Sequence, residues 1–366
     1  MQITEAMFAL PDQGFPVQLS DGVKRHAQQD PFFHLALLKN NRSKVLTQYF
    51  AHNPVRKIFI GADLHGFAYQ HPSLEVVQLD KDYFTENDPA RRQAKRDELE
   101  GAIVVLNNND VGRGGGAPNY GDFYTRCDKT IVAVWDWDNH HWLDNSTFAA
   151  VHADLYVPAH HENLYLLTRY NWCTAGPVYC ATIQWPRNFL ADQAAHIATA
   201  ERSNEPLGMH VGYPAFSFRN RVVSTLSQKY PSIGFSTHSF HARTLQDRFD
   251  EWVAHKAHWI IPVLNDVPIR IFDALISGGI PIVPESLRYL PPINQIDRAH
   301  ILFYTPEDIV APERIVQQAI RIFDEGGIDG IMTRHRYALA HHHGSGRVDS
   351  ILGFVAEKFG LQGLAR

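Results

Sequence analysis

Short runs of valine, isoleucine and other apolar residues recur along this chain, each followed by polar residues and then by a pattern with helical spacing. Continuous apolar runs of this length are typical of parallel strands covered on both faces, although periodicity alone does not exclude a buried helix. In the first half the predicted strands are 56–63, 101–108, 130–138 and 155–161, with crossover helices at 88–100 and 144–154. This alternation of strands and helices predicts an open α/β sheet.

The same alternation resumes after a polar segment in the middle of the chain. Residues 187–208 fit a helix that ends in a Ser-Asn-Glu-Pro-Leu-Gly linker, which is the best candidate for a domain boundary. Further strands are predicted at 208–213, 232–240, 258–265, 280–285 and 300–304, with helical patterns between most of them. We therefore predict two doubly wound α/β domains, 1–200 and 208–346, followed by a C-terminal helix within 347–366.

The composition of the chain argues against some functions and locations that an α/β fold would allow. The chain has 366 residues, of which 45% are hydrophobic, and a net charge of −5, which argues against general affinity for nucleic acid. Three cysteines are too few for a disulfide framework and favour a reducing compartment. The first residues lack the pattern of a signal peptide, and no apolar run is long enough to cross a bilayer. We expect a cytoplasmic protein with at most peripheral membrane contact.

The segment "RIFDALISGGIPIVPES" (270–286) carries the first candidate chemistry. In open α/β sheets, ligands bind beyond the carboxyl ends of the strands, and the strand 258–265 brings Asn265 to that edge. Spacing of three and four residues then places Arg270, Asp273 and Ser277 on one face of the next helix, which the Gly-Gly pair ends. A cation in the first turn opposes the helix dipole unless an anion binds there. A surface ion pair between Arg270 and Asp273 explains the spacing equally well.

A second junction between a strand and a helix, "GYPAFSFRNRVV" (212–223), repeats this arrangement with Arg219 and Arg221. Two such junctions in one domain suggest a shared crevice for a diphosphate or a carboxylate, in which Asp273 can accept hydrogen bonds from a sugar hydroxyl.

The residues Arg270-x-Phe272-Asp273-Ala274-Leu275, followed by the Gly-Gly-Ile-Pro-Ile-Val run, resemble the donor motif of GT-B glycosyltransferases of the exostosin-like and related bacterial type. The resemblance covers about 20 residues together with the order of the two domains. It implies two Rossmann-like domains that face each other, a nucleotide-sugar donor on the C-terminal domain, and a C-terminal helix that returns to the first domain. The family usually has Glu where Asp273 stands. The implied activity is sugar transfer to a glycan, lipid-linked or small-molecule acceptor, as in polysaccharide biosynthesis.

Under this resemblance the first domain holds the acceptor and any general base. An inverting transferase needs one base, commonly Asp or His, to deprotonate the acceptor hydroxyl. The richest polar cluster at a predicted strand end is "WDWDNHHW" (135–142), in which Asp138 and His140 are the leading base candidates, followed by His65. Trp135 and Trp137 are candidates for stacking on the acceptor sugar, with Asp136 beside them.

Two alternatives remain open from the sequence. Asp136-x-Asp138 after an apolar strand resembles the DxD motif with which GT-A glycosyltransferases hold a divalent cation, a role that suits carboxylate oxygens. A non-catalytic two-domain protein that closes on an anionic ligand would also explain the arginines. The adjacent histidines, His160-His161 and 341–343, lack the spaced partners of a structural metal site, so we expect no required cofactor, and a divalent metal is not favoured.

Overall fold

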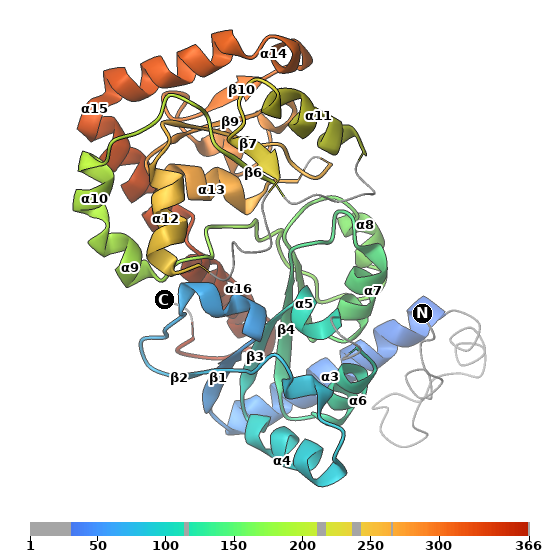
Figure 1. Cartoon of the computed structure of the whole chain (residues 1–366). Coiled ribbons are helices and arrows are strands. Elements are labelled where there is room, and N and C mark those ends of the chain that lie inside the picture. The colour runs from blue at the N-terminus through green and yellow to red at the C-terminus, as the bar shows by residue number, and fades with distance from the viewer. Residues whose placement is uncertain (1–30, 113–116, 211–216, 236–242, 265, 365–366) are drawn as a thin grey trace. The chain divides into compact units, whose positions relative to one another are not determined.

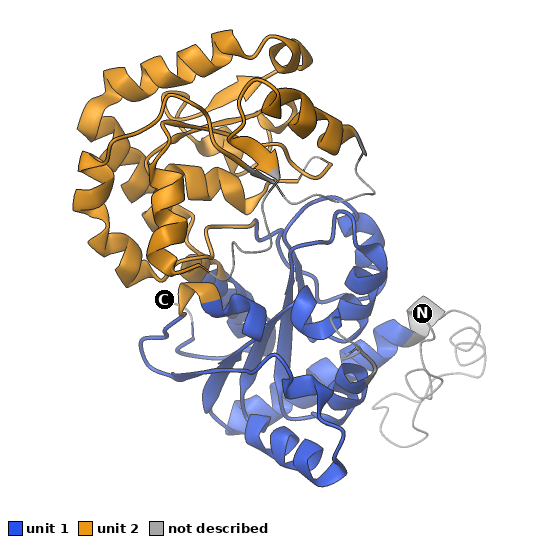
Figure 2. Ribbon diagram, in the orientation of Figure 1, with its two compact units in different colours: residues 1–65, 69–179, 348–366 blue, residues 66–68, 180–347 orange. Residues whose placement is uncertain are grey.

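The computed structural model describes residues 31–112, 117–210, 217–235, 243–264 and 266–364. The chain forms two compact units (Figure 2). Unit 1 comprises residues 1–65, 69–179 and 348–366, and unit 2 comprises residues 66–68 and 180–347. The division made from the sequence instead ended the first domain at residue 200 and began the second at residue 208.

Unit 1 is built on a five-stranded parallel sheet with the Rossmann-like order β2-β1-β3-β4-β5 (Figure 1). Its strands are β1 (Lys57–Ile60), β2 (Glu75–Gln78), β3 (Ile103–Asn107), β4 (Ile131–Asp136) and β5 (Leu155–Pro158). The apolar runs of the sequence predict four of these strands but not β2. That strand lies at the sheet edge and is partly exposed at all four positions, so it lacks the apolar run that marks the others.

Every residue of β3 and β4 is buried, as expected for strands covered on both faces. On one face, the buried core joins strand residues such as Val104 and Val132 to aromatic residues of the helices, including Tyr120 and Phe123. The helical elements of unit 1 are α3 (Pro31–His52), η2 (Tyr83–Thr85), α4 (Pro89–Leu99), α5 (Asn108–Gly112), α6 (Ala117–Arg126), α7 (Leu143–Val151) and α8 (Leu164–Leu167). Two further helices, η1 (Ala62–Phe67) and α16 (Gly344–Phe359), begin in one unit and end in the other.

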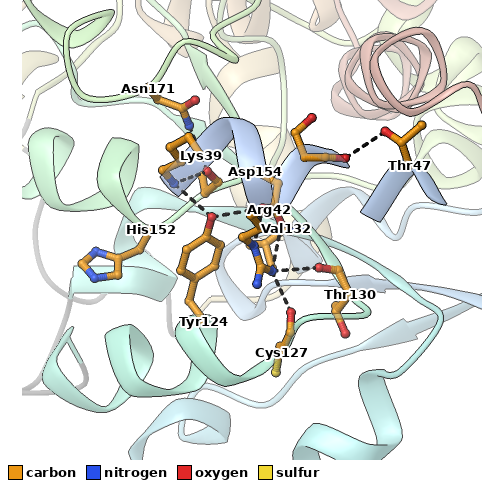
Figure 3. Close-up of polar contacts among 12 residues, drawn as sticks. Lys39, Arg42, Thr47, Tyr124, Cys127, Thr130, Val132, His152, Asp154 and Asn171 are labelled. Carbon is orange, nitrogen blue, oxygen red and sulfur yellow. Dashed lines mark hydrogen bonds and ion pairs between the residues drawn. The ribbon is translucent and has the colours of Figure 1, made fainter. Parts of the chain in front are cut away.

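A buried polar cluster fastens α3 to the amino-terminal ends of β4 and β5 (Figure 3). Arg42 Nε donates to Asp154 Oδ1 at 2.6 Å, and its Nη2 donates to the carbonyl oxygens of Cys127 and Thr130 at 2.7 and 3.1 Å. Lys39 Nζ donates to the Ala153 carbonyl oxygen at 2.6 Å. This cluster therefore lies at the amino-terminal edge of the sheet, opposite the carboxyl edge where ligands bind in open α/β sheets.

Unit 2 also contains parallel sheets. The three-stranded sheet has the order β10-β9-β8, with β8 (Ala257–Trp259), β9 (Ile280–Pro284) and β10 (Leu302–Tyr304), and the parallel pair is β6 (Gly208–His210) with β7 (Ile233–Phe235). A parallel bridge between Leu207 and His258 links the pair to the larger sheet. All five strands fall within or next to the segments predicted from the sequence. The chain is therefore an α/β protein with a Rossmann-like five-stranded parallel sheet in unit 1 and a second, three-stranded parallel sheet in unit 2.

The helices of unit 2 agree with the sequence pattern less closely. They are α9 (Arg187–Asp192), α10 (Ala194–Thr199), α11 (Ser217–Ser227), α12 (Leu245–Val253), α13 (Ile269–Ile276), α14 (Pro306–Val310) and α15 (Glu313–His341), with η5 (Glu285–Leu287) and η6 (Ile293–Gln295). The single helix predicted for 187–208 is two short helices. The predicted end of α13 at its Gly-Gly pair is confirmed, since Gly278 has a φ of +78° and a Cβ there would lie 2.6 Å from Ile331. In the described part of the chain, no helix is long and apolar enough to cross a membrane.

Candidate functional site

The carboxyl ends of the unit 2 strands surround a pocket of about 420 Å³. Its walls come from α11, from the residues after β8, and from the ends of β9 and β10; they include Phe218, Arg219, Ile261, Leu264, Glu285 and Tyr304. This edge is where ligands bind in open α/β sheets, because loops and helix N-termini meet there. The fold therefore places this pocket at the edge of the unit 2 sheet where the sequence predicted a crevice.

The pocket combines apolar walls with a buried cation, Arg219, and with the carboxylate of Glu285, which pairs with Arg288. Phe218 and Leu264 are 76% and 55% exposed, so apolar surface is open to solvent at this site. Arg219, in the first turn of α11, is only 3% exposed, and its Nε donates to the carbonyl oxygen of Ile261 at 3.2 Å. Apolar walls with few polar groups are typical of sites for small organic ligands, and the guanidinium adds attraction for an anion.

Only part of the predicted donor set lies at this pocket. Arg219 lines it, whereas Arg221 is exposed on α11 and is not one of its lining residues. Asn265 falls outside the described residues. Arg270, half-buried in the first turn of α13, is likewise not a lining residue.

Asp273 and Ser277 are fully buried and make contacts within unit 2. Gln184 Nε2 donates to Asp273 Oδ2 at 2.7 Å, and the Ser277 hydroxyl donates to the Ala274 carbonyl oxygen at 2.8 Å. Burial raises the pKa of Asp273 to about 7, against the opposing influence of hydrogen bonds from Thr182 and Gln184 and of nearby arginines. In this structure the predicted helix face therefore packs against protein, and Ser277 secures the end of α13.

At the carboxyl edge of unit 1, the first two residues of the predicted cluster are enclosed. Trp135 is fully buried and its Nε1 donates to the Val178 carbonyl oxygen at 2.8 Å, so its ring is not exposed for stacking on a sugar. Asp136 is fully buried and accepts hydrogen bonds from Tyr156 Oη at 2.6 Å and from the backbone N–H of Asp138 at 3.0 Å. Burial raises the pKa of Asp136 to about 6.

The next residues are more accessible. Trp137 is half-buried and packs edge-on against Trp135 with ring centroids 5.3 Å apart. Asp138 keeps 26% of its side chain exposed and contacts Asn108 Nδ2 at 2.8 Å and His141 Nε2 at 3.4 Å. Burial alone would raise the pKa of Asp138, but the hydrogen bonds from His141 and Asn108 outweigh it and hold the pKa below its ordinary value. Asp138 is therefore ionised at neutral pH.

The two histidine candidates for the base differ in environment. His140 is 7% exposed, and burial together with His160 and His141 lowers its pKa to about 2. A base with so low a pKa takes up a proton weakly at neutral pH. His65 lies half-buried in η1, and its Nε2 is enclosed without a hydrogen-bond partner among the described residues.

Sequence reasoning missed several residues that line the pocket or position the candidate base. Phe218 and Tyr304 lie at the pocket in unit 2. In unit 1, Asn108 belongs to a polar cluster at a predicted strand end (107–110), but its role was not predicted: it holds both Asp138 and the backbone N–H of Trp137. Each stands at or directly after a strand, or in the first turn of the helix that follows, so the same rule that selected the arginines could have found them. No protein-family model matches this chain, and no curated protein sequence matches it.

Proposed function

We propose that this protein is a glycosyltransferase that uses a nucleotide-sugar donor, with its two Rossmann-like units acting as the facing domains of a GT-B enzyme. The observation that carries the proposal is the apolar pocket at the carboxyl edge of the unit 2 sheet, with the buried Arg219 in its wall. A nucleotide presents a flat apolar base and an anionic diphosphate, and the pocket offers a matching surface for each.

In this proposal the donor nucleotide binds in unit 2. Its base packs against the exposed ring of Phe218 and the apolar wall of the pocket, and its phosphates lie toward Arg219 and the first turn of α11. Asp273 is a buried acid and Arg270 is a cation near it. For either side chain to reach the donor, its present contacts would have to change.

Unit 1 supplies the general base. Asp138 is the best placed of the three base candidates, because it is partly exposed at the carboxyl edge of the sheet and ionised. Because Asp136 is enclosed and bound to Tyr156, Asp138 is the only carboxylate of the Asp-x-Asp pair that is open to an external ligand. This arrangement favours the GT-B proposal over a GT-A mechanism that needs both carboxylates on one cation.

The test is calorimetric titration of the protein with UDP, GDP, CMP, ADP and dTDP. We expect at least one of them to bind, and Phe218→Ala to weaken that binding by about fivefold or more, since stacking of a base on an aromatic ring is worth about 1–3 kcal/mol. Tyr289→Ala is the matched control, because Tyr289 is 77% exposed on the same unit and does not line the pocket.

Transfer of a labelled sugar then separates an enzyme from a binding protein. Nucleotide binding without hydrolysis or transfer for any donor of the bound nucleotide would favour the non-catalytic alternative. Failure of all five nucleotides to bind the folded protein would refute the proposed function.

A further inference from the structure

Two histidines that follow neighbouring strands lie together in unit 1. His140 comes after β4 and His160 comes after β5, and their ring centroids are 4.4 Å apart. A nitrogen that can bind a metal on one ring lies within 4.8 Å of such a nitrogen on the other. Because a zinc ion binds imidazole nitrogen at about 2.0–2.1 Å, small rotations of these side chains bring both nitrogens onto one ion.

The surroundings of His160 set its tautomer. Its Nε2 lies 3.0 Å from the carbonyl oxygen of Trp137, which can only accept, so this nitrogen carries the proton and the neutral ring has its lone pair on Nδ1. A ligand histidine in a metal site typically donates its other N–H to a carbonyl in this way. Asn139 fixes the backbone of His160 with two hydrogen bonds, from His160 N–H to Asn139 Oδ1 at 2.9 Å and from Asn139 Nδ2 to the His160 carbonyl oxygen at 2.8 Å.

His140 provides the second observation. Its side chain is 7% exposed, and neither of its ring nitrogens has a hydrogen-bond partner among the residues that the structure describes. Buried polar groups are almost always satisfied, so an imidazole enclosed in this manner calls for a ligand. The Asp138 carboxylate lies close enough to act electrostatically on both rings and would offset the charge of a cation.

We propose that His140 and His160 bind one divalent transition-metal ion of the zinc type, through His160 Nδ1 and a ring nitrogen of His140. Imidazole ligands suit Zn²⁺, Co²⁺, Ni²⁺ and Cu²⁺, whereas Mg²⁺ and Ca²⁺ prefer oxygen. With two protein nitrogens, further coordination positions remain for water or for an oxygen ligand. The site does not depend on the proposed transferase activity and differs from the predicted Asp-x-Asp cation site, because the Asp136 carboxylate takes no part in it.

The test uses the full-length protein after treatment with a chelator. Calorimetric titration with ZnCl₂ should show one Zn²⁺ site per chain that His140→Gln and His160→Gln each weaken by at least about tenfold, since loss of a supporting hydrogen bond alone costs about 10–100-fold in metal affinity. His161→Gln is the matched control, because its side chain is adjacent in sequence and 44% exposed. It should leave the affinity unchanged.

Two outcomes would overturn the proposal. One is unchanged zinc affinity in folded His140→Gln and His160→Gln proteins, which would place the metal on other histidines. The other comes from X-ray absorption of the zinc-loaded wild-type protein, a measurement that remains possible if the variants do not fold. The spectrum should show two imidazole ligands on zinc, and a spectrum without imidazole would exclude the site.

Discussion

At the scale of single residues, burial decides what the charged groups of the candidate sites do. Asp138 and Asp136 are two residues apart, yet hydrogen bonds lower the pKa of the first while burial raises the pKa of the second to about 6. Arg219 lies almost fully buried in the wall of an apolar pocket, where attraction for an anion is weakly screened by solvent. Similar side chains at similar strand ends thus have different chemical roles.

Asp273 gives a prediction about pH. Its pKa is raised from 3.8 to about 7, so the folded protein retains a proton that the unfolded chain releases. Below about pH 4 the titration of this carboxyl group does not lower the free energy of unfolding, because the group is protonated in both the folded and the unfolded chain. As the pH rises from 4 to 7, it lowers the free energy of unfolding progressively. Asp273→Asn should therefore gain stability relative to wild type over this range, by a few kcal/mol at most since each pKa unit is worth about 1.4 kcal/mol.

Urea denaturation at several pH values between 4 and 8 measures this difference. Asn keeps an oxygen that can accept the hydrogen bond from Gln184. The difference between the two proteins therefore reports the titration of Asp273 and not the loss of this hydrogen bond. A difference in the free energy of unfolding that stays constant with pH would show that Asp273 titrates normally.

At the scale of elements, helix α3 shows how a segment can be held without a strong amphipathic pattern. Its helical spacing was not recognised in the sequence. The structure fastens it through Arg42 and Lys39, whose side chains reach Asp154 and the backbone at the amino ends of the strands (Figure 3). Buried polar groups that have hydrogen-bond partners fix the position of the helix that carries them and also stabilise the fold.

Arg42→Ala should lower the free energy of unfolding by about 3–5 kcal/mol, because it leaves the buried carboxylate of Asp154 without its ion pair. Lys44→Ala on the same helix is the control, since Lys44 is exposed. Chemical denaturation followed by circular dichroism measures both. Equal effects of the two substitutions would mean that the cluster does not hold α3 in place.

At the scale of the whole molecule, the two compact units are not two continuous stretches of chain. Residues 348–366 belong to unit 1, although the chain has passed through unit 2 before reaching them. Val348, Ile351, Leu352 and Val355 of α16 are fully buried. The last helix therefore contributes core to the first unit.

A pair of substitutions tests this division. Leu352→Ala in α16 and Leu275→Ala in α13 each remove a fully buried side chain and should cost about 2–5 kcal/mol. Hydrogen exchange should accelerate first in β3 and β4 for Leu352→Ala and first in β8 and β9 for Leu275→Ala. The same pattern of exchange in both variants would show that the two units unfold as one.

The sequence by itself determined the α/β class, nine of the ten strands among the described residues and the Gly-Gly end of α13, because these depend on local apolar runs and on backbone conformations that glycine favours. It also pointed to the strand ends where the pocket and the histidine pair lie. Only the tertiary structure decided which side chains there are open and which are enclosed. Arg219 lines a pocket, whereas Asp273, Ser277 and Trp135 pack inside their units. The exposure of a side chain depends on which distant parts of the chain pack over it, and the spacing of residues along the sequence does not specify that packing.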